Sequence, residues 1–476
     1  MLIKHLTSAA ALFVVFLSHP ACAQELSMRD IQAQLRTLTT QVQKLSETVE
    51  RQDKIIQRQE AALRNKKETL TSFEQSKRQI KDQVALLETD LETSQTQGNF
   101  DGIKITKDPT PKFETADGKF SFQPFGRVHL DATFFDNDKS GNKSNTNIRR
   151  ARFGFKGKIG EDLEYNSEMD FSEDEADIQD MTLTYTGLKS VNLTVGHHRP
   201  PVGFERNTSS NHNMMIERAV STNLFSANRR IGASVATKAE NYSLAVGVYN
   251  EDAGADDDEG EDFSIDSRLS ANLLGLYDED NEDVFHVGFG HSFQVPDGDV
   301  RYRARPGIGD GARFVDTGVI DDVDTINIMN AELVGVFGPL SFQSEYFITA
   351  LSRESEDARL DGYYGQIGYF LTGETRNYDG ASGLFKRTRV LDDFSMKSSG
   401  AGAWELLARY DHTNLNDLGS GLSGGKLDLY TVGLNWYLNK NVRLMGNVIM
   451  VNSDENAATA ANDDPTIFKM RAQWDF

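Results

Sequence analysis

The sequence predicts an all-β transmembrane barrel of about sixteen antiparallel strands, preceded by a long α-helical coiled coil. Three observations predict this fold class: an apolar repeat of 3.5 residues over 24–97, a period of two residues over 119–476, and an alternation of short and long joins between the predicted strands. The mean hydropathy of −0.49 excludes a polytopic helical membrane protein, which needs several runs of roughly 20 apolar residues. It does not exclude a barrel, because the inner faces of barrel strands are polar.

The first predicted element is a signal peptide over residues 1–23. Lys4 precedes an apolar core from Ala9 to Leu17, and Ala21-Cys22-Ala23 supplies the small residues that a signal peptidase reads. A single anchoring helix is less favoured, because this core is too short to span a bilayer. Cleavage before Gln24 would remove the only cysteine of the chain, so the mature protein would hold no disulfide.

Residues 24–97 form the second predicted element, a coiled coil in the periplasm. Fifteen of the twenty positions reached from Met28 by alternate steps of three and four are apolar, and neither proline nor glycine interrupts the segment. Such a repeat keeps one stripe facing partner helices and imposes a left-handed supercoil. Gln52 and Gln59 at core positions favour a trimeric coil. A long helix folded back on its own chain is the alternative. A linker over 98–118 follows.

The negative charge belongs to the third predicted domain, the barrel of residues 119–476. The formal net charge is −22, but 24–97 holds 12 basic and 12 acidic residues and is neutral. The acidic balance argues against nucleic acid as a partner. Much of the acidity lies in loops such as Glu251–Asp262. That run does not follow the ligand spacing of a calcium loop, so we predict neither a metal site nor a cofactor.

Sixteen segments of 119–476 show strand periodicity. The predicted strands are 120–135, 147–158, 163–172, 178–186, 191–199, 229–238, 241–250, 263–274, 284–294, 324–337, 340–350, 359–371, 402–412, 427–438, 441–453 and 466–476. Short joins such as Gly338-Pro339 alternate with long joins such as 200–228, as in outer-membrane barrels with short periplasmic turns and long external loops. The segment 372–401 is long where a short turn is expected, which leaves the count open by one hairpin.

Charged residues recur on the minor face of the predicted strands. In the last strand, Phe468 to Phe476 alternates apolar residues with Lys469, Arg471, Gln473 and Asp475. Neither lipid nor a packed core can hold many such charges. A wide, water-filled barrel can hold them on its lumen side. The aromatic Phe476 also resembles the terminal signal that outer-membrane barrels present to their assembly machinery.

Several segments resemble the phosphate-selective porin O and P family. They are Ile148-Arg149-Arg150-Ala151-Arg152-Phe153, Thr184-Tyr185-Thr186-Gly187-Leu188, Gly362-Tyr363-Tyr364-Gly365-Gln366 with Leu371-Thr372-Gly373-Glu374, Gly402-Ala403-Trp404-Glu405-Leu406 with Arg409-Tyr410-Asp411, and Gly433-Leu434-Asn435-Trp436-Tyr437. Their order and spacing span roughly 118–476. The resemblance implies a trimeric porin of sixteen strands whose third external loop, here 200–228, folds into the pore.

The resemblance also implies an anion site built from arginines on the second strand together with a lysine and serines around the third loop. Guanidinium groups suit phosphate geometry, and rings of such charges select anions. The candidate pore-lining residues are Arg149, Arg150, Arg152, Lys156, Ser209, Ser210, Arg218, Arg230, Arg268 and Arg409. Asn211-His212 stands where the resemblance implies the lysine.

A salt-bridge network is the alternative interpretation of these arginines. The facing strands carry Glu164, Glu168, Asp170 and Asp180. These carboxylates could neutralise the arginines and leave the lumen without anion preference.

The combined prediction is a porin of the bacterial outer membrane that lets small hydrophilic solutes diffuse, with a preference for anions or phosphate. Its predicted partners are outer-membrane lipid and lipopolysaccharide, two further copies in a homotrimer, and small anions. Through the coil, peptidoglycan or another periplasmic partner is also expected. The alternatives are a non-selective or cation-preferring porin and a barrel whose coil tethers the outer membrane to peptidoglycan.

We predict no catalytic residues. The sequence contains no nucleophile elbow, zinc signature or phosphate-binding loop. His197 and His198 are neighbours on a predicted strand, so we expect their side chains to point to opposite faces and not to ligate one metal ion.

Overall fold

The computed structural model describes the barrel region and a few residues before it. The described residues are 98–100, 102–107, 110–173, 176–250, 263–278, 281–297, 300–309, 311–453 and 463–476, together with Arg36, Thr39, Thr40, Gln43, Lys44, Lys54 and Gln57. The chain divides into two units, 1–94 and 95–476. The seven described residues of the first unit are helical. The predicted signal peptide and the rest of the predicted coil lie outside the described residues, so both stay predictions. Among the described residues, no helix is long and apolar enough to cross a membrane.

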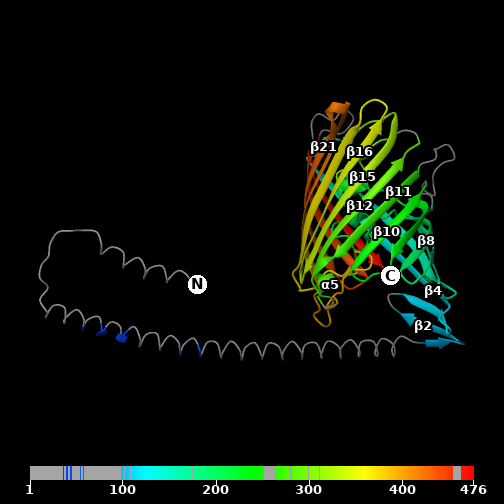
Figure 1. Cartoon of the computed structure of the whole chain (residues 1–476), viewed down its shortest axis with the longest axis vertical. Helices are drawn as coiled ribbons and strands as arrows, with labels where there is room; N and C mark the ends of the chain where they lie inside the picture. Colours follow the sequence, from blue (N-terminus) through cyan, green and yellow to red (C-terminus); the bar gives the residue numbers. More distant parts are fainter. Residues whose placement is uncertain are drawn as a thin grey trace. The chain divides into compact units, whose positions relative to one another are not determined.

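The second unit is a closed barrel of sixteen antiparallel strands (Figure 1). Its strands are β4 (Phe120–Asp136), β5 (Asn145–Ile159), β6 (Leu163–Asp170), β7 (Asp177–Tyr185), β8 (Val191–His198), β9 (Arg230–Thr237), β10 (Tyr242–Tyr249), β11 (Phe263–Asn272), β12 (Val284–Val295), β15 (Val323–Phe337), β16 (Leu340–Arg353), β17 (Ala358–Phe370), β20 (Ala403–Asp417), β21 (Leu422–Tyr437), β22 (Val442–Ser453) and β23 (Thr466–Asp475). Each strand pairs with the next, and β23 closes on β4 from Thr466↔Asp136 to Asp475↔Arg127. All sixteen predicted strands are confirmed.

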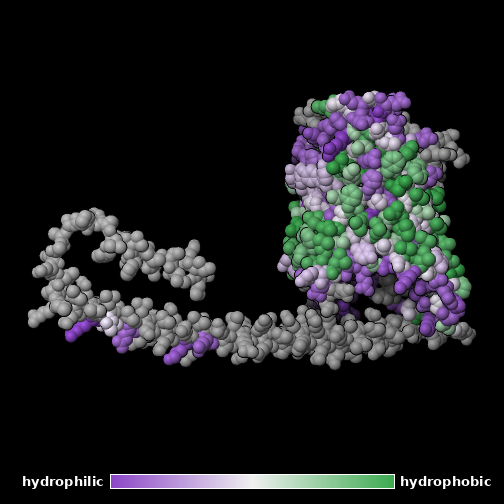
Figure 2. Space-filling model, in the orientation of Figure 1, coloured by the Kyte–Doolittle hydropathy of each residue, from purple (hydrophilic) through white to green (hydrophobic). Residues whose placement is uncertain are grey.

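The barrel wall is apolar outside and polar inside. On β23, Phe468, Met470 and Trp474 are exposed, whereas Lys469 and Arg471 are buried in the lumen. In Figure 2, apolar side chains gather on the middle of the barrel wall and polar side chains gather at both ends. This is the reverse of a water-soluble sheet, and it is the arrangement that a hydrocarbon environment requires of a barrel.

The segment 98–118, which we expected to be a linker, contains three short strands. They are β1 (Gly98–Phe100), β2 (Ile103–Lys107) and β3 (Pro111–Thr115), and β3 pairs with β4 at Phe113↔Phe122. These strands form because the first part of β4 extends beyond β23. β4 begins at Phe120, seven residues before Arg127, where its pairing with β23 ends. An unpaired strand edge exposes backbone donors and acceptors, and β3 covers part of it.

Three connections fold into the lumen. The first, 199–229, carries α3 (Phe204–Asn207) and α4 (Val220–Phe225); the second, 296–322, carries β13 (Arg303–Ala304) and β14 (Val315–Asp316); the third, 371–402, carries β18 (Tyr378–Asp379) and β19 (Leu384–Phe385). Two further short helices, α5 (Leu273–Tyr277) and η1 (Leu418–Ser420), lie in other connections. The first inward fold agrees with the prediction for 200–228. The segment 371–402 adds no strand pair to the barrel, because its two-residue strands pair only with each other.

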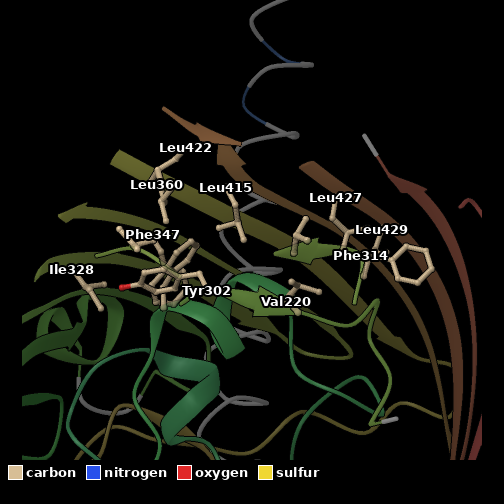
Figure 3. Packing of buried hydrophobic residues seen from close by; sticks show 14 of the residues in the cluster. Val220, Tyr302, Phe314, Ile328, Phe347, Leu360, Leu415, Leu422, Leu427 and Leu429 are labelled. Atoms are coloured by element: carbon tan, nitrogen blue, oxygen red, sulfur yellow. The ribbon is translucent and has the colours of Figure 1, made fainter. Parts of the chain in front are cut away.

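Part of the lumen is filled by an apolar core, so the interior is narrower than the wide lumen that we expected. Tyr302 and Phe314 of the second inserted segment pack with α4 residues and with inward apolar residues of β15 to β22, including Phe347, Leu360 and Leu427 (Figure 3). These strands therefore carry apolar residues on both faces in this region. Burying the lumen side of these strands stabilises the fold by roughly 25 cal/mol for each Å² of apolar surface that is removed from water.

A second apolar cluster joins two inserted segments to each other. Phe204 and Met214 of 199–229 pack with Phe385 of β19 and with Val334 and Leu407 of the wall. The rings of Phe204 and Phe385 meet edge to face at 5.0 Å. The first and third insertions therefore support one another inside the barrel, and they set the walls of the space that remains.

Candidate functional site

A β-bulge turns two consecutive arginines into the lumen. Between β4 and β5, His129 pairs with Arg150 and Leu130 pairs with Ile148, so Arg149 is an extra residue without a cross-strand partner. A bulge re-aims the side chains of its strand. Both guanidinium groups consequently approach Glu217 of the first inserted segment, at 3.1 Å from Arg149 Nε and 3.9 Å from Arg150 Nη2.

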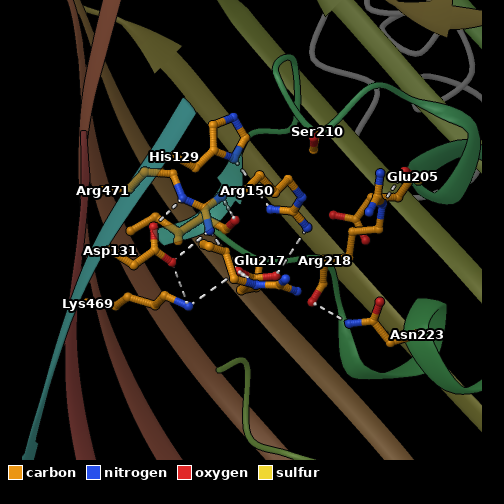
Figure 4. Close-up of polar contacts among 12 residues, drawn as sticks. His129, Asp131, Arg150, Glu205, Ser210, Glu217, Arg218, Asn223, Lys469 and Arg471 are labelled. Carbon is orange, nitrogen blue, oxygen red and sulfur yellow. Dashed lines mark hydrogen bonds and ion pairs between the residues drawn. The ribbon is translucent and has the colours of Figure 1, made fainter. Parts of the chain in front are cut away.

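Ion pairs of Glu217 hold the first inserted segment against the barrel wall (Figure 4). Arg471 Nη2 lies 2.7 Å and Lys469 Nζ 3.3 Å from its carboxylate. Burial opposes the charge of Glu217, but Arg149, Lys469, Arg471 and Arg150 hold its pKa well below the usual range. Glu217 therefore stays ionised and cross-links β5, β23 and the inserted segment.

A cavity of about 370 Å³ lies between the first inserted segment and the wall formed by β5, β7 and β8. Seven of its fourteen lining residues are arginines, and only two are carboxylates, Asp177 and Glu217. The arginines are Arg149, Arg150, Arg152, Arg199, Arg206, Arg218 and Arg229. Such an excess of fixed positive charge in a confined space favours an anion.

Some of these arginines are neutralised by the wall, as the salt-bridge alternative predicts. Arg152 Nε lies 2.7 Å from Asp170, and Arg229 donates from Nε and Nη2 to the two oxygens of Asp180, each at 2.9 Å. Glu168 lies 3.4 Å from Arg152. Glu164 takes no part, because it faces Lys158 at 3.9 Å.

Three arginines of the cavity are held differently. Arg218 donates to the backbone oxygens of Glu205 and Thr208, both at 2.9 Å, and Arg199 donates to the Arg206 oxygen at 2.7 Å. Within the described part of the chain, neither these two nor Arg206 forms an ion pair. The buried Nε of Arg206 has no hydrogen-bond partner there.

Arg206 and Arg218 keep their charge at neutral pH. Burial lowers the pKa of Arg218 to about 9 and that of Arg206 to about 10, both above 7. Burial also lowers the pKa of Arg199. The cavity therefore presents guanidinium groups that form no ion pair with a carboxylate of the described residues, although Glu205 and Glu217 act on Arg218 from a greater distance. Carbonyl contacts hold these groups in place.

The structure brings together four of the ten candidate residues, Arg149, Arg150, Arg152 and Arg218. Ser209 and Ser210 do not line this cavity. Their hydroxyl oxygens accept hydrogen bonds from Arg127 Nη1 at 3.2 and 3.1 Å.

Arg268 and Arg409, expected to line the pore, hold inserted segments instead. Arg268 donates to both oxygens of Glu332, at 2.8 and 2.7 Å, and to the backbone oxygens of Ser382 and Gly383. Arg409 donates a hydrogen bond from Nη1 to the backbone oxygen of Glu217 at 2.9 Å. A buried guanidinium requires acceptors, and the inserted segments supply them.

Two further candidates lie outside the cavity. The Lys156 ammonium lies 5.6 Å from the ring centroid of Phe125. Arg230 opens β9, whereas its neighbour Arg229 lines the cavity.

Sequence reasoning missed Arg127, Arg199, Arg206 and Arg229. Arg199 directly precedes the loop 200–228, which the resemblance places in the pore, and Arg206 lies within it. Their position in this loop is the sequence feature that could have identified them. Arg229-Arg230 repeats the paired arginines at 149–150.

The expectation that His197 and His198 point to opposite faces of their strand is wrong. Gly196 has a φ of +122°, and this conformation interrupts the alternation of β8. His197 lines the cavity, and His198 Nε2 lies 2.9 Å from Ser234 Oγ and 3.1 Å from Tyr249 Oη, both on the lumen side. Among the described residues, no group of three or more potential ligands could hold a metal ion.

His212, which stands where a lysine was expected, adds no charge. Burial together with the nearby Arg387, Arg443 and Arg127 lowers its pKa to about 3. Its backbone oxygen accepts a hydrogen bond from Arg376 at 3.3 Å. The ring is therefore neutral at physiological pH.

The closed barrel with an apolar outer wall and a charged, constricted lumen defines an outer-membrane channel. Residues 122–476 match the family described as phosphate-selective porin O and P, and the chain belongs to that family. The suspected resemblance is thus confirmed over the barrel.

Relatives of known sequence agree. Porin O of Pseudomonas aeruginosa is 28% identical over 406 residues, covering 76% of this chain and 90% of the relative. An uncharacterised protein of Caulobacter vibrioides is 30% identical over 354 residues, covering 70% of this chain and 68% of the relative. The anion-selective porin from Comamonas acidovorans is a similar solved structure, with 12% identity, 75% of this chain and 100% of that chain covered, and a TM-score of 0.47. The chain is an outer-membrane porin.

Proposed function

We propose that the channel prefers small anions and that the arginine cavity is its phosphate-selective constriction. The observation that supports this most directly is the set of three guanidinium groups, Arg199, Arg206 and Arg218, that line the cavity and form no ion pair with a described carboxylate. A guanidinium presents two parallel N–H donors to two oxygens of a phosphate. Arg149, Arg150 and Arg152 on β5 complete the ring of charge, and the partial pairing of Arg152 lets an anion leave again.

A basic entrance supports the same proposal. A cavity of about 200 Å³ beside the second inserted segment is lined by Lys143, Arg149 and Lys469 among others. Arg149 belongs to both cavities, so an anion could pass from one to the other along this side chain. Fixed charges along a path raise the local concentration of counter-ions.

Reversal potentials in planar bilayers test the proposal. We expect a potassium chloride gradient across a membrane with single channels to give a reversal potential that favours chloride, and added phosphate to reduce the chloride current. A potential favouring potassium would overturn the anion preference and would support the cation-preferring alternative. A protein that inserts as a folded barrel and conducts no ions would overturn the channel itself.

For residues 24–97 we propose a periplasmic coiled coil that trimerises together with the barrel. The uninterrupted 3.5-residue repeat of that segment supports it. Crosslinking of native membranes should then give a trimer whose yield falls when 24–97 is deleted. An unchanged trimer yield would contradict this role of the coil.

Tethering is the second candidate function, favoured by the length and neutrality of the same segment. If the coil reaches peptidoglycan, intact protein should co-sediment with peptidoglycan sacculi and the deletion variant should not. Equal sedimentation of both forms would exclude the tether. We propose no catalytic activity for either unit, since the relatives are channels.

A further inference from the structure

The outer side of the barrel carries an apolar groove that the channel function does not use. The groove has a volume of about 580 Å³ and lies where β2 and β3 meet β4, β5 and β6. Seven of its lining residues are large and apolar or aromatic: Ile103, Phe113, Phe120, Phe122, Phe155, Ile159 and Tyr165. Phe120 is 52% exposed and Ile103 is 41% exposed. A concave apolar patch of this kind marks a binding surface.

The groove is continuous with the membrane-facing wall. Ring contacts run from Phe113 on β3 to Phe122 on β4 at 6.5 Å, on to Phe155 on β5 at 5.8 Å, and then to Tyr165 on β6 at 6.2 Å. Phe122 and Phe155 belong to the outward rows of their strands. The small sheet of β2 and β3 therefore extends the apolar outer face of the barrel beyond the end of β23.

The position of the groove selects its membrane leaflet. The groove lies at the end of the barrel where strands are joined by short turns, such as 160–162 between β5 and β6. Short turns are periplasmic in outer-membrane barrels. Tyr165 lies two residues after the start of β6, and tyrosine at such a rim marks the boundary between hydrocarbon and headgroups.

We propose that this groove binds an acyl chain of a phospholipid of the periplasmic leaflet. The apolar lining matches a hydrocarbon chain, and the continuity with the lipid-facing wall gives the chain a path from the bilayer into the groove. The two faces of β2 differ accordingly. Ile103 lines the groove, whereas Lys104 does not, although its cross-strand neighbour Glu114 and Lys158 of β5 belong to the lining. The extension of 98–118 would thereby anchor the rim of the barrel to lipid.

Site-directed fluorescence quenching tests the proposal on the full chain. Cys22, the only natural cysteine, lies in the predicted signal peptide, so the mature chain accepts one labelled thiol at a time. Ile103→Cys and Lys104→Cys, on opposite faces of β2, would each carry an environment-sensitive fluorophore. Phe113→Cys and Lys112→Cys on β3 form a second pair in case the first perturbs folding. The proteins are reconstituted in vesicles of phosphatidylethanolamine with acyl chains brominated near their ends.

We expect brominated acyl chains to quench the labels at 103 and 113 several-fold more than those at 104 and 112, with little quenching by aqueous iodide at the first two. Equal iodide quenching at all four positions would overturn the proposal, because the groove would then hold water. Labels at 103 and 113 shielded from both quenchers would also overturn it. Recovery of iodide quenching after deletion of 24–97 would then identify the coil as the occupant, and no recovery would indicate a second copy. Native conductance of each variant verifies folding, since the groove lies outside the lumen.

Discussion

Arg149 reaches the lumen only because β5 is bulged at that residue. Strict alternation would place Arg149 and Arg150 on opposite faces of the strand, and the charge of one of them would then face lipid. The extra residue between the pairs His129↔Arg150 and Leu130↔Ile148 removes this conflict. Glu217 fixes the result, because it accepts a hydrogen bond from Arg149 and forms an ion pair with Arg150 at 3.9 Å. A local irregularity of one residue therefore adds a charge to the constriction.

Arg218 provides the residue-scale test of the anion site. Its charge has no carboxylate partner among the described residues, and a hydrogen bond to a charged group contributes about 1.5–3 kcal/mol. We expect Arg218→Gln to weaken phosphate block of the chloride current about tenfold or more. The matched control is Arg359→Gln, at an exposed position of β17, which should leave phosphate block unchanged. Equal losses in both variants would contradict a local site.

His212 predicts a pH dependence of barrel stability. In the folded chain the pKa of His212 is about 3, against an ordinary value of 6.5. As the pH falls, His212 therefore binds a proton in the unfolded chain before it does so in the folded chain. Stability contributed by the neutral ring is complete above pH 6.5 and is lost progressively below it. We expect the unfolding temperature of the native protein to fall more between pH 7 and pH 4 than that of His212→Gln. Parallel pH profiles would show that another group dominates.

The inserted connections decide the bore of the channel at the scale of elements. The sequence analysis predicts an inward fold for 200–228 only, and it finds 372–401 long where a short turn is expected. In the structure, β18 and β19 enter the lumen because Arg268 donates hydrogen bonds to the backbone oxygens of Ser382 and Gly383. The carboxylate of Glu332 neutralises the charge of Arg268. His286 adds a contact of 2.8 Å to Tyr378 Oη. A buried ion pair between β11 and β15 therefore keeps a connection inside the pore.

Breaking this ion pair should open the channel. Glu332→Gln leaves the buried guanidinium of Arg268 without its carboxylate, at a cost of about 3–5 kcal/mol. We expect the single-channel conductance to rise and become noisier, with the sign of the ion preference unchanged. Lys386→Gln is the control, because Lys386 and Asp379 form an exposed pair in the same hairpin that contributes about 0–1 kcal/mol. A conductance equal to that of the native channel would contradict the role of the hairpin.

Closure of the barrel is the decisive event for the whole molecule. Phe476 and Gly126 exchange backbone hydrogen bonds of 3.0 and 3.1 Å, next to the last pair of β23 with β4. A Cβ on Gly126 would lie 2.6 Å from the Phe476 ring and 2.7 Å from the backbone oxygen of Arg152. The seam of the barrel therefore depends on glycine at 126.

Substitution at this glycine tests the seam. We expect Gly126→Ala to reduce the yield of folded, heat-modifiable barrel in the outer membrane, because the oxygen of Arg152 belongs to the rigid sheet. Gly365→Ala on β17 is the matched control, since no atom lies within 4 Å of its added Cβ. Heat-modifiable migration on gels measures both. Similar yields for the two variants would show that the seam tolerates a side chain.

The sequence by itself determined the barrel and its family. Period-two alternation, the lengths of the joins and the ordered motifs located all sixteen strands, because each strand must face lipid on one side and the lumen on the other. The family resemblance also indicated that 200–228 folds into the barrel, and four of the candidate arginines line the cavity.

Only the tertiary structure decided which charges remain available to an anion. Arg268 and Arg409 look like Arg218 in the sequence, yet the first two form ion pairs, Arg268 with Glu332 at 2.7 Å and Arg409 with Glu205 at 3.7 Å. Arg199 and Arg206 are held by hydrogen bonds within the first inserted segment, to the backbone oxygens of Arg206 and Thr222. The physical reason is that a buried charge takes its state from neighbours far away in the chain, and strand periodicity carries no information about them.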